Sequence, residues 1–252
     1  MLPFFQLTVF HIGVVPIQVW GFMVALGILC ATFVAAKKAK RDGLNPEIVW
    51  DAAFWLIVGA GIGARVFMVV YEPAVYLMHP PELLRVWEGG FSEMGGILGA
   101  LVALAVYFRH RLKDVWGYLG AMAYALPLGL GIGRIGCFLI HDHPGTLTHF
   151  LLGVRYPDGV RHDHGLYLSL EGFLMFLLFV WLDRKHAKPQ TFVFGFFLLH
   201  GCVRFGLDFL RAADVRYLFL TPAQFVSIGM IGLGTYYAVW WHRKEHSKEK
   251  ST

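Results

Sequence analysis

Charged residues are scarce in this sequence: only 15% of its 252 residues are charged, whereas soluble globular domains carry about 25%. Hydrophobic residues make up 57% of the chain, and the mean hydropathy is +0.56. This composition excludes an ordinary soluble enzyme, a coiled coil and a disordered chain, and it is typical of a sequence that lies in lipid. The three cysteines are too few for a disulfide framework. The composition therefore predicts an integral membrane protein.

Long apolar runs predict how the chain crosses the membrane. The first six residues contain no basic residue, and no small-residue cleavage site follows the first apolar run, so we expect a retained helix rather than a signal peptide. A spanning helix needs about 20 mostly apolar residues. Seven stretches qualify: Val15–Ala36, Val49–Tyr71, Gly90–Phe108, Val115–Leu139, Leu166–Leu182, Phe192–Leu210 and Pro222–Trp241. The sequence predicts an all-α integral membrane protein with seven transmembrane helices in a single membrane domain, residues 1–252.

The basic residues predict the orientation of these helices. All nine lysines and several arginines follow the first, third, fifth or seventh stretch: Lys37, Lys38, Lys40, Arg41, Arg109, Arg111, Lys113, Arg184, Lys185, Lys188, Arg243, Lys244, Lys248 and Lys250. Because cytoplasmic loops favour Lys and Arg, the N-terminus is expected outside and the C-terminus in the cytoplasm. This placement accounts for the net charge of +5 without a nucleic-acid partner. Two outer segments are longer than turns, and we expect an interfacial arm at about residues 72–88 and a small outer-face cap at about residues 140–165.

An arginine lies among glycines in the fourth stretch. Arg134 follows Gly133 and precedes Gly136 and Cys137. A charge at bilayer depth is costly and usually faces protein or a water-filled cavity. Glycines allow a backbone or a ligand to approach closely, and the guanidinium fork suits a phosphate. The pattern favours an anion site, although close helix packing with a snorkelling arginine would leave the same pattern. Cys137 is either a reactive thiol or a small packing residue.

The sixth stretch carries a polar stripe. His200, Arg204, Asp208 and Arg211 have the spacing of one helical face. Such a face must meet protein or water, and Asp208 can neutralise only one arginine, which leaves the other to hold an anion. A structural ion pair at a helix end is the alternative. Arg65 follows Gly63 and Ala64 and resembles the site at Arg134, with Glu72 as a possible partner.

Two His-Asp-His clusters lie in the expected cap, at residues 141–143 and 162–164. Paired His and Asp residues are compatible with a divalent metal, with general acid–base catalysis by one histidine, or with hydrogen bonds that hold the cap together. The spacing alone leaves these three possibilities open.

Taken together, these motifs resemble the prolipoprotein diacylglyceryl transferases of the bacterial inner membrane. The likeness covers nearly the whole chain and rests on short segments: Pro16-Ile17-Gln18-Val19-Trp20-Gly21, Gly63-Ala64-Arg65-Val66, Trp87-Glu88-Gly89-Gly90, Gly95-Gly96-Ile97-Leu98-Gly99, Gly133-Arg134-Ile135-Gly136, Arg161-His162, Leu166-Tyr167, Arg204-Phe205, Asp208-Phe209 and Arg211, with Gln224 and Ser227. The resemblance implies transfer of a diacylglyceryl group from phosphatidylglycerol to the thiol of a prolipoprotein lipobox cysteine, next to the signal peptide. It implies no cofactor and no metal.

The resemblance also implies roles for single residues. Arg134 and Arg204 would bind the lipid phosphate, Asp208 would orient one of them and Arg211 would lie near the headgroup. Gly133 and Gly136 would let the lipid approach. The remaining substrate-binding residues would be Cys137, Asp142, Arg65 and Trp20.

The chain departs from the family pattern around the reacting centre. Met94 stands where the family has His, Cys137 where it has Asn, Asp142 where it has Glu, and Trp20 where it has Tyr; Asp163-His164-Gly165 replaces Pro-Ser-Gln. His141, His143 or His200 is expected to substitute for the missing His. The alternatives are a catalytically altered or inactive lipid-binding paralogue and a metal-dependent intramembrane hydrolase.

Overall fold

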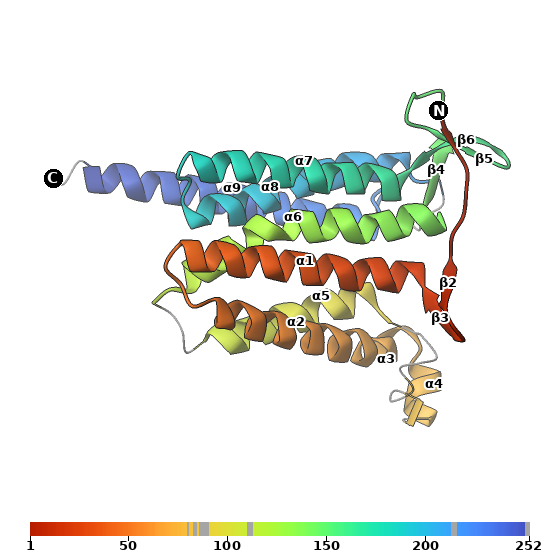
Figure 1. Cartoon of the computed structure of the whole chain (residues 1–252), viewed down its shortest axis with the longest axis horizontal. Coiled ribbons are helices and arrows are strands. Elements are labelled where there is room, and N and C mark those ends of the chain that lie inside the picture. Colours follow the sequence, from red (N-terminus) through yellow and green to blue (C-terminus); the bar gives the residue numbers. More distant parts are fainter. Residues whose placement is uncertain (80, 83–84, 86–90, 110–112, 213–215, 250–252) are drawn as a thin grey trace. The chain divides into compact units, whose positions relative to one another are not determined.

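The computed structural model describes residues 1–79, 81–82, 85, 91–109, 113–212 and 216–249 and is mostly helical (Figure 1). Five segments are long and apolar enough to cross a membrane: α1 (Val19–Arg41), α2 (Pro46–Val66) with its continuation to Val70, α6 (Val115–Ile140), α7 (His164–Arg184), and α8 (Pro189–Leu207) with its continuation to Leu210. The prediction of a mostly helical membrane protein is confirmed at this level.

The two remaining predicted spans also contain helices. The third corresponds to α5 (Glu93–Phe108), which is apolar but has only 16 residues, and the seventh to α9 (Pro222–Glu249). The span count of seven and the orientation stay predictions. The predicted start of the first span is wrong, because residues Val15–Gln18 form strand β3, which pairs with β2 (Val9–Ile12) around a turn at Gly13. Pro16 suits an edge strand and has no N–H for a helix interior.

The chain forms two compact units, and the larger comprises Met1–Ala35 with Leu119–Thr252. Its helices pack through glycines, since a Cβ at Gly27 of α1 would lie 2.5 Å from the Gly129 carbonyl oxygen of α6. A Cβ at Gly172 of α7 would lie 2.7 Å from the Gly131 Cα. Small residues allow helix backbones to approach closely in membranes. Figure 1 shows α6, α7, α8 and α9 running alongside one another.

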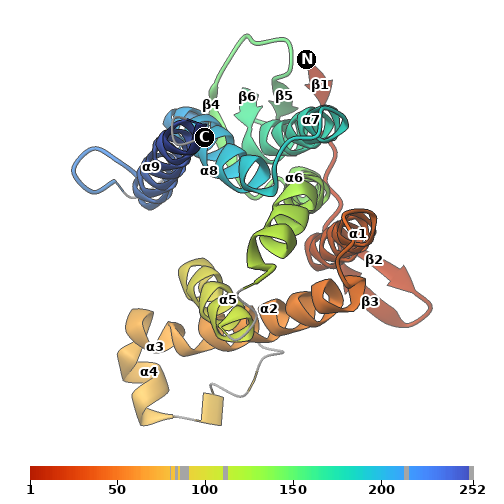
Figure 2. The ribbon, with the colours of Figure 1, turned by 90° about the vertical axis from the view of Figure 1, so that its left-hand side faces the viewer.

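A small sheet lies at one end of this unit, where the outer-face cap was predicted, so the description all-α is wrong for this segment (Figures 1 and 2). Its strand order is β1-β5-β6-β4, with bounds Leu2–Pro3, Val154–Tyr156, Gly159–Asp163 and Pro144–Leu147. The short turn at Gly159, with φ of 135°, joins β5 to β6 as a hairpin. The parallel pairing of β1 with β5 fastens the N-terminus to the cap.

The second unit, Ala36–Tyr118, contains α2, α3 (Met68–Tyr71), α4 (Pro73–Met78) and α5. Helices α2 and α5 lie together (Figure 2) and cross at glycines, because a Cβ at Gly63 would lie 2.3 Å from the Gly95 carbonyl oxygen and one at Gly59 would lie 2.6 Å from that of Gly99. Within the predicted interfacial arm, the structure describes α4 and a few residues around it. Positions 80, 83–84 and 86–88 of the arm lie outside the described residues. So do the segment 87–90, Arg111 and Lys250.

Candidate functional site

Arg134 lies in the last two turns of α6, at the cap end of the larger unit. Its side chain is half-buried, and its Nη1 donates a hydrogen bond to Cys137 Sγ at 3.7 Å. Among the ion pairs formed by the described residues, none involves Arg134. A guanidinium at the end of a membrane helix with a thiol as its partner retains most of its capacity to bind an anion.

The glycines around Arg134 divide into two kinds. A Cβ at Gly136 would lie 3.1 Å from the Trp20 Cα, and one at Gly131 would lie 3.2 Å from the Ser169 carbonyl oxygen, so these positions serve helix packing. A Cβ at Gly133 would meet only Val24, at 3.9 Å, which is an ordinary contact. Of the two glycines expected to admit a lipid, Gly136 therefore faces the backbone of α1, whereas a Cβ at Gly133 would have room.

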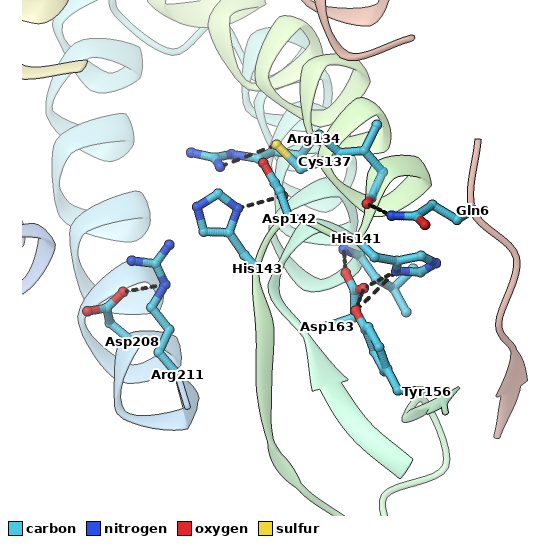
Figure 3. Close-up of polar contacts among 12 residues, drawn as sticks. Gln6, Arg134, Cys137, His141, Asp142, His143, Tyr156, Asp163, Asp208 and Arg211 are labelled. Atoms are coloured by element: carbon cyan, nitrogen blue, oxygen red, sulfur yellow. Dashed lines mark hydrogen bonds and ion pairs between the residues drawn. The ribbon is translucent and has the colours of Figure 1, made fainter. Parts of the chain in front are cut away.

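The two His-Asp-His clusters do not each form a site of their own, because a histidine of the first cluster contacts the aspartate of the second. His141 Nδ1 lies 2.8 Å from Asp163 Oδ2, and His141 Nε2 donates to the Phe5 carbonyl oxygen at 3.0 Å (Figure 3). The Tyr156 hydroxyl donates to the same Asp163 oxygen at 2.6 Å, and burial beside this carboxylate raises the pKa of Tyr156. Both ring nitrogens of His141 thus face acceptor oxygens, which favours a structural role over proton transfer from a substrate.

Asp142 and His143 lie on the other side of this turn, next to Cys137. His143 Nδ1 is 2.5 Å from Asp142 Oδ1, and the thiol, the carboxylate and the imidazole have potential ligand atoms within 4.8 Å of one another. Figure 3 shows the three side chains facing one another below Arg134. Trp20, in the first turn of α1, also interacts with the Cys137 sulfur. The structure thus brings together five of the predicted site residues: Arg134, Trp20, Cys137, Asp142 and His143.

His200 has an acidic partner that the sequence reasoning did not pair with it. Its Nδ1 lies 2.8 Å from Oε1 of Glu171 on α7, and both side chains are mostly buried. Because a carboxylate only accepts hydrogen bonds, Nδ1 carries a proton, and Nε2 is the ring nitrogen that does not face the acid. Arg204 follows His200 by one turn on α8.

The predicted common face of four residues on α8 is wrong for Arg211, whereas Asp208 still donates its N–H to the Arg204 carbonyl oxygen. The helix ends at Leu207, and Asp208–Leu210 form a 3₁₀ turn, so that the extended residue Arg211 instead pairs with Gly145 in the cap. Tighter winding over Asp208–Leu210 and the extended backbone at Arg211 turn this arginine away from the helical stripe. His200, Arg204 and Asp208 keep the predicted spacing.

Asp208 joins this turn to the start of α9. Its carboxylate accepts a short hydrogen bond from the Thr221 hydroxyl, and its other oxygen lies 3.6 Å from Arg211 Nε. Thr221 and Gln224 form a capping box: Gln224 N donates to Thr221 Oγ1 at 3.1 Å, and Thr221 N donates to Gln224 Oε1 at 3.0 Å. The ion pair that the structure gives for Asp208 is with Arg211, and its predicted role of orienting Arg134 or Arg204 stays a prediction.

A buried histidine lies in the same neighbourhood. His164 is 2% exposed, and its ring approaches the Leu210 carbonyl without meeting hydrogen-bond geometry. Arg211, Arg204 and Asp208 all lie within electrostatic range of this ring. The two arginines of the sixth stretch are therefore grouped around one mostly buried polar region.

Comparison of the sequence with those of known proteins identifies the family of this chain. The sequence model of the prolipoprotein diacylglyceryl transferase family matches residues 7–240. The chain belongs to this family. Relatives named phosphatidylglycerol–prolipoprotein diacylglyceryl transferase come from Mannheimia succiniciproducens (34% identity, 91% of this chain and 88% of the relative), Pasteurella multocida (33%, 91% and 87%) and Pseudomonas paraeruginosa (30%, 95% and 95%).

In this diacylglyceryl transferase family member, Arg65 has surroundings quite unlike those of Arg134. It belongs to the second unit and is 7% exposed, and its Nη2 donates to the carbonyl oxygens of Glu82 and Arg85 at 3.0 and 2.6 Å. Its guanidinium also lies 5.9 Å from the Tyr76 ring centroid and 5.4 Å from that of Phe91. These contacts fasten the segment after α4 to α2, and the substrate-binding role of Arg65 stays a prediction.

Sequence reasoning missed three residues of these networks, and two of them left a signal in the sequence. Glu171 is an acid within a predicted span, which by itself calls for a partner. Thr221 begins the sequence Thr-Pro-Ala-Gln, a capping box with proline at the first helical position. Tyr156 left none, because its contact with Asp163 depends on the hairpin register.

Proposed function

We propose that this protein transfers the diacylglyceryl group of phosphatidylglycerol to the thiol of a prolipoprotein lipobox cysteine. Membership of the family and the names of relatives that align over most of their length support this activity. The observation that carries the residue assignment is Arg134, which has a thiol and not an acid as its side-chain partner among the described residues. Its positive charge is therefore available to an anionic lipid.

In the proposed step the acceptor sulfur attacks the glyceryl carbon that bears the phosphate ester. The carbon–sulfur bond forms while the carbon–oxygen bond breaks, and glycerol phosphate leaves with the electron pair. The thiol proton passes to a base, which yields a thioether. Negative charge grows on the departing phosphate oxygen, so cationic donors held next to it lower the barrier.

Arg134 and Arg204 are proposed as the phosphate ligands, with Arg211 near the headgroup. One carboxylate oxygen of Asp208 forms an ion pair with Arg211 Nε, and the other accepts a hydrogen bond from the Thr221 hydroxyl at the start of α9. Arg204 and Arg211 both lie within electrostatic range of the buried His164, so they belong to one polar region. Cationic side chains grouped in this way favour binding of a phosphate.

His200 is proposed as the base that takes the thiol proton. Glu171 fixes the ring tautomer so that Nε2 is the basic nitrogen, as a carboxylate does for the histidine of a catalytic triad. His200 also lies one helical turn from Arg204, a proposed phosphate ligand. His141 lacks such a nitrogen because Asp163 and the Phe5 carbonyl occupy both sides of its ring.

The finer topology belongs to the same proposal. Seven spans with the N-terminus outside would place Arg134 and the cap at the outer face of the bacterial inner membrane, where the signal peptide of a prolipoprotein presents its lipobox. The common location of the cap strands and the end of α6 supports this arrangement.

The test is incubation of the purified full-length protein with labelled phosphatidylglycerol and a lipobox peptide. We expect thioether product from the wild-type protein and from the control Arg155→Ala, whose arginine is exposed on β5. Lipid binding without product would instead identify an inactive lipid-binding paralogue.

A second set of variants tests the base. We expect His200→Ala to lower kcat by about 10²- to 10⁴-fold, since general bases contribute about this much, and His149→Gln, on an exposed loop, to have no effect. As a positioning residue, Glu171 is expected to act on kcat while KM for the lipid stays unchanged, and Glu171→Asp should restore part of the rate lost in Glu171→Gln. Full activity of His200→Ala would refute this assignment.

A further inference from the structure

Three side chains of different donor chemistry converge where α6 ends. Cys137 lies in the last turn of the helix and is 5% exposed, whereas Asp142 and His143 lie on the following loop. One potential ligand atom from each residue lies within 4.8 Å of the other two. Thiolate, carboxylate and imidazole are ligands of Zn²⁺ and related transition metals, and three protein ligands with one open position form a common zinc arrangement.

The backbone explains why residues five and six positions after Cys137 return to it. His141 has φ of 53°, in the left-handed region that non-glycine residues seldom adopt. Its ring is held by Asp163 and by the Phe5 carbonyl and stacks on Phe4 with a centroid distance of 4.6 Å. These contacts maintain the reversal of chain direction and keep Asp142 and His143 over the last turn of α6.

The imidazole of His143 supplies an independent observation. Its Nδ1 is inaccessible to solvent and pairs with Asp142 Oδ1 at 2.5 Å, without the alignment of a hydrogen bond. The pair holds the imidazole and the carboxylate together next to the thiol, and a transition metal that displaces the ring proton would gain both groups as ligands. Arg134, 3.7 Å from the sulfur, sets one positive charge against two potentially anionic donors, so the cluster still favours a divalent cation.

We propose that Cys137, Asp142 and His143 form a transition-metal site of the zinc class with an open coordination position next to Arg134. Two of its ligands, Cys137 and Asp142, stand where the family pattern has other residues, so the site would distinguish this chain from the usual pattern. Metal binding here requires neither lipid nor acceptor and is independent of the proposed transfer.

The experiment is a Co²⁺ titration of the chelator-treated full-length protein, without a polyhistidine tag, in detergent. We expect a near-ultraviolet thiolate-to-cobalt charge-transfer band that Zn²⁺ abolishes by competition. Cys137→Ser should remove the band, and His143→Ala should weaken cobalt affinity at least about tenfold. The matched controls Cys30→Ser and Cys202→Ser should keep the charge-transfer band and the cobalt affinity of the wild-type protein.

Absence of the band from the wild-type protein, or its persistence in Cys137→Ser, would overturn the proposal. His143→Ala guards against misfolding as the cause, since it changes a partly exposed loop side chain and leaves the thiol in place; unchanged cobalt affinity in this variant would also count against the site. A band together with a complete lack of diacylglyceryl transfer would support the metal site and refute only the proposed activity.

Discussion

Two segments of this protein combine glycines with an arginine, and the structure uses them differently. In residues 61–65 the arginine is buried and bonded to two backbone carbonyls, whereas in residues 131–134 it is half-buried and bonded to a thiol. Gly63 is in close contact with the backbone of α5, while a Cβ at Gly133 would meet only Val24. Similar sequence patterns thus produce one arginine that is bonded to the backbone of its own unit and one arginine in a candidate anion site.

The difference shows that a guanidinium within a membrane span can be bonded to backbone carbonyl groups of the protein itself. What distinguishes the two arginines is whether the protein supplies acceptors for the guanidinium. Carbonyl oxygens of Glu82 and Arg85, together with two aromatic rings, satisfy Arg65. A sulfur is a weak acceptor, so Arg134 retains donors for a phosphate.

The largest expected effect comes from Arg134→Ala. Loss of a donor to the developing phosphate charge should lower kcat/KM by about 10²- to 10³-fold. The melting temperature in detergent should change little, because no ion pair of the described residues is lost. Steady-state transfer assays and thermal unfolding measure the two quantities. Transfer at the wild-type rate would remove the distinction between the two arginines.

Arg65→Ala should show the opposite pattern. The substitution leaves two carbonyl groups without their cationic donor and should cost about 2 kcal/mol of stability. The specific activity of the folded fraction should stay within about threefold of the wild type, because we assign the contacts of Arg65 to the second unit. A large rise in KM for phosphatidylglycerol with unchanged stability would instead confirm the predicted substrate-binding role.

The glycines provide a matched pair of smaller changes. In Gly63→Ala the new Cβ would lie 2.3 Å from the Gly95 carbonyl oxygen, so we expect a loss of about 1–3 kcal/mol. In Gly133→Ala the stability should stay within about 0.5 kcal/mol of the wild type. If the lipid approaches at Gly133, this variant should raise KM for the lipid. Equal destabilisation by the two substitutions would contradict the packing difference.

The smallest effect is expected at Gly61, where a Cβ would meet no atom within 4 Å. Gly61→Ala should stabilise α2 by about 0.5–1 kcal/mol, since alanine favours helix more than glycine does. Thermal unfolding of Gly61→Ala, compared with that of the wild type and of Gly63→Ala, measures this gain in stability. A destabilised Gly61→Ala protein would show that this face of α2 is covered.

Hydrophobic runs predicted the helices well because helix length and apolarity are local properties of the chain. Each predicted span contains a helix, and α6 differs from its predicted bounds by one residue. The first span was predicted to begin too early, since the apolar run starts at Val15 but Val15–Gln18 pairs as a strand with Val9–Ile12. The cap strands are short and polar, so their pairing leaves little periodic signal in the sequence.

The candidate site was predictable in its components and not in its pairings. Arg134, Cys137 and Asp142 were predicted as neighbours of a phosphate, and the structure groups the three. Asp163 was predicted within one cluster, yet it contacts the histidine of the other. His200 was predicted as a base without its carboxylate, because the partner lies on a different helix. Side chains 22 and 29 positions apart meet only when the helices and hairpin are packed.

The sequence by itself determined that the chain is a membrane protein, where most helices lie and which family it belongs to, since apolar length and short motifs are written along the chain. The tertiary structure alone decided which arginine is satisfied by carbonyl groups, which glycines touch another backbone and which histidine faces which acid. These outcomes depend on distances between residues remote in sequence, and such distances are set by the packing of helices and by the register of a small sheet.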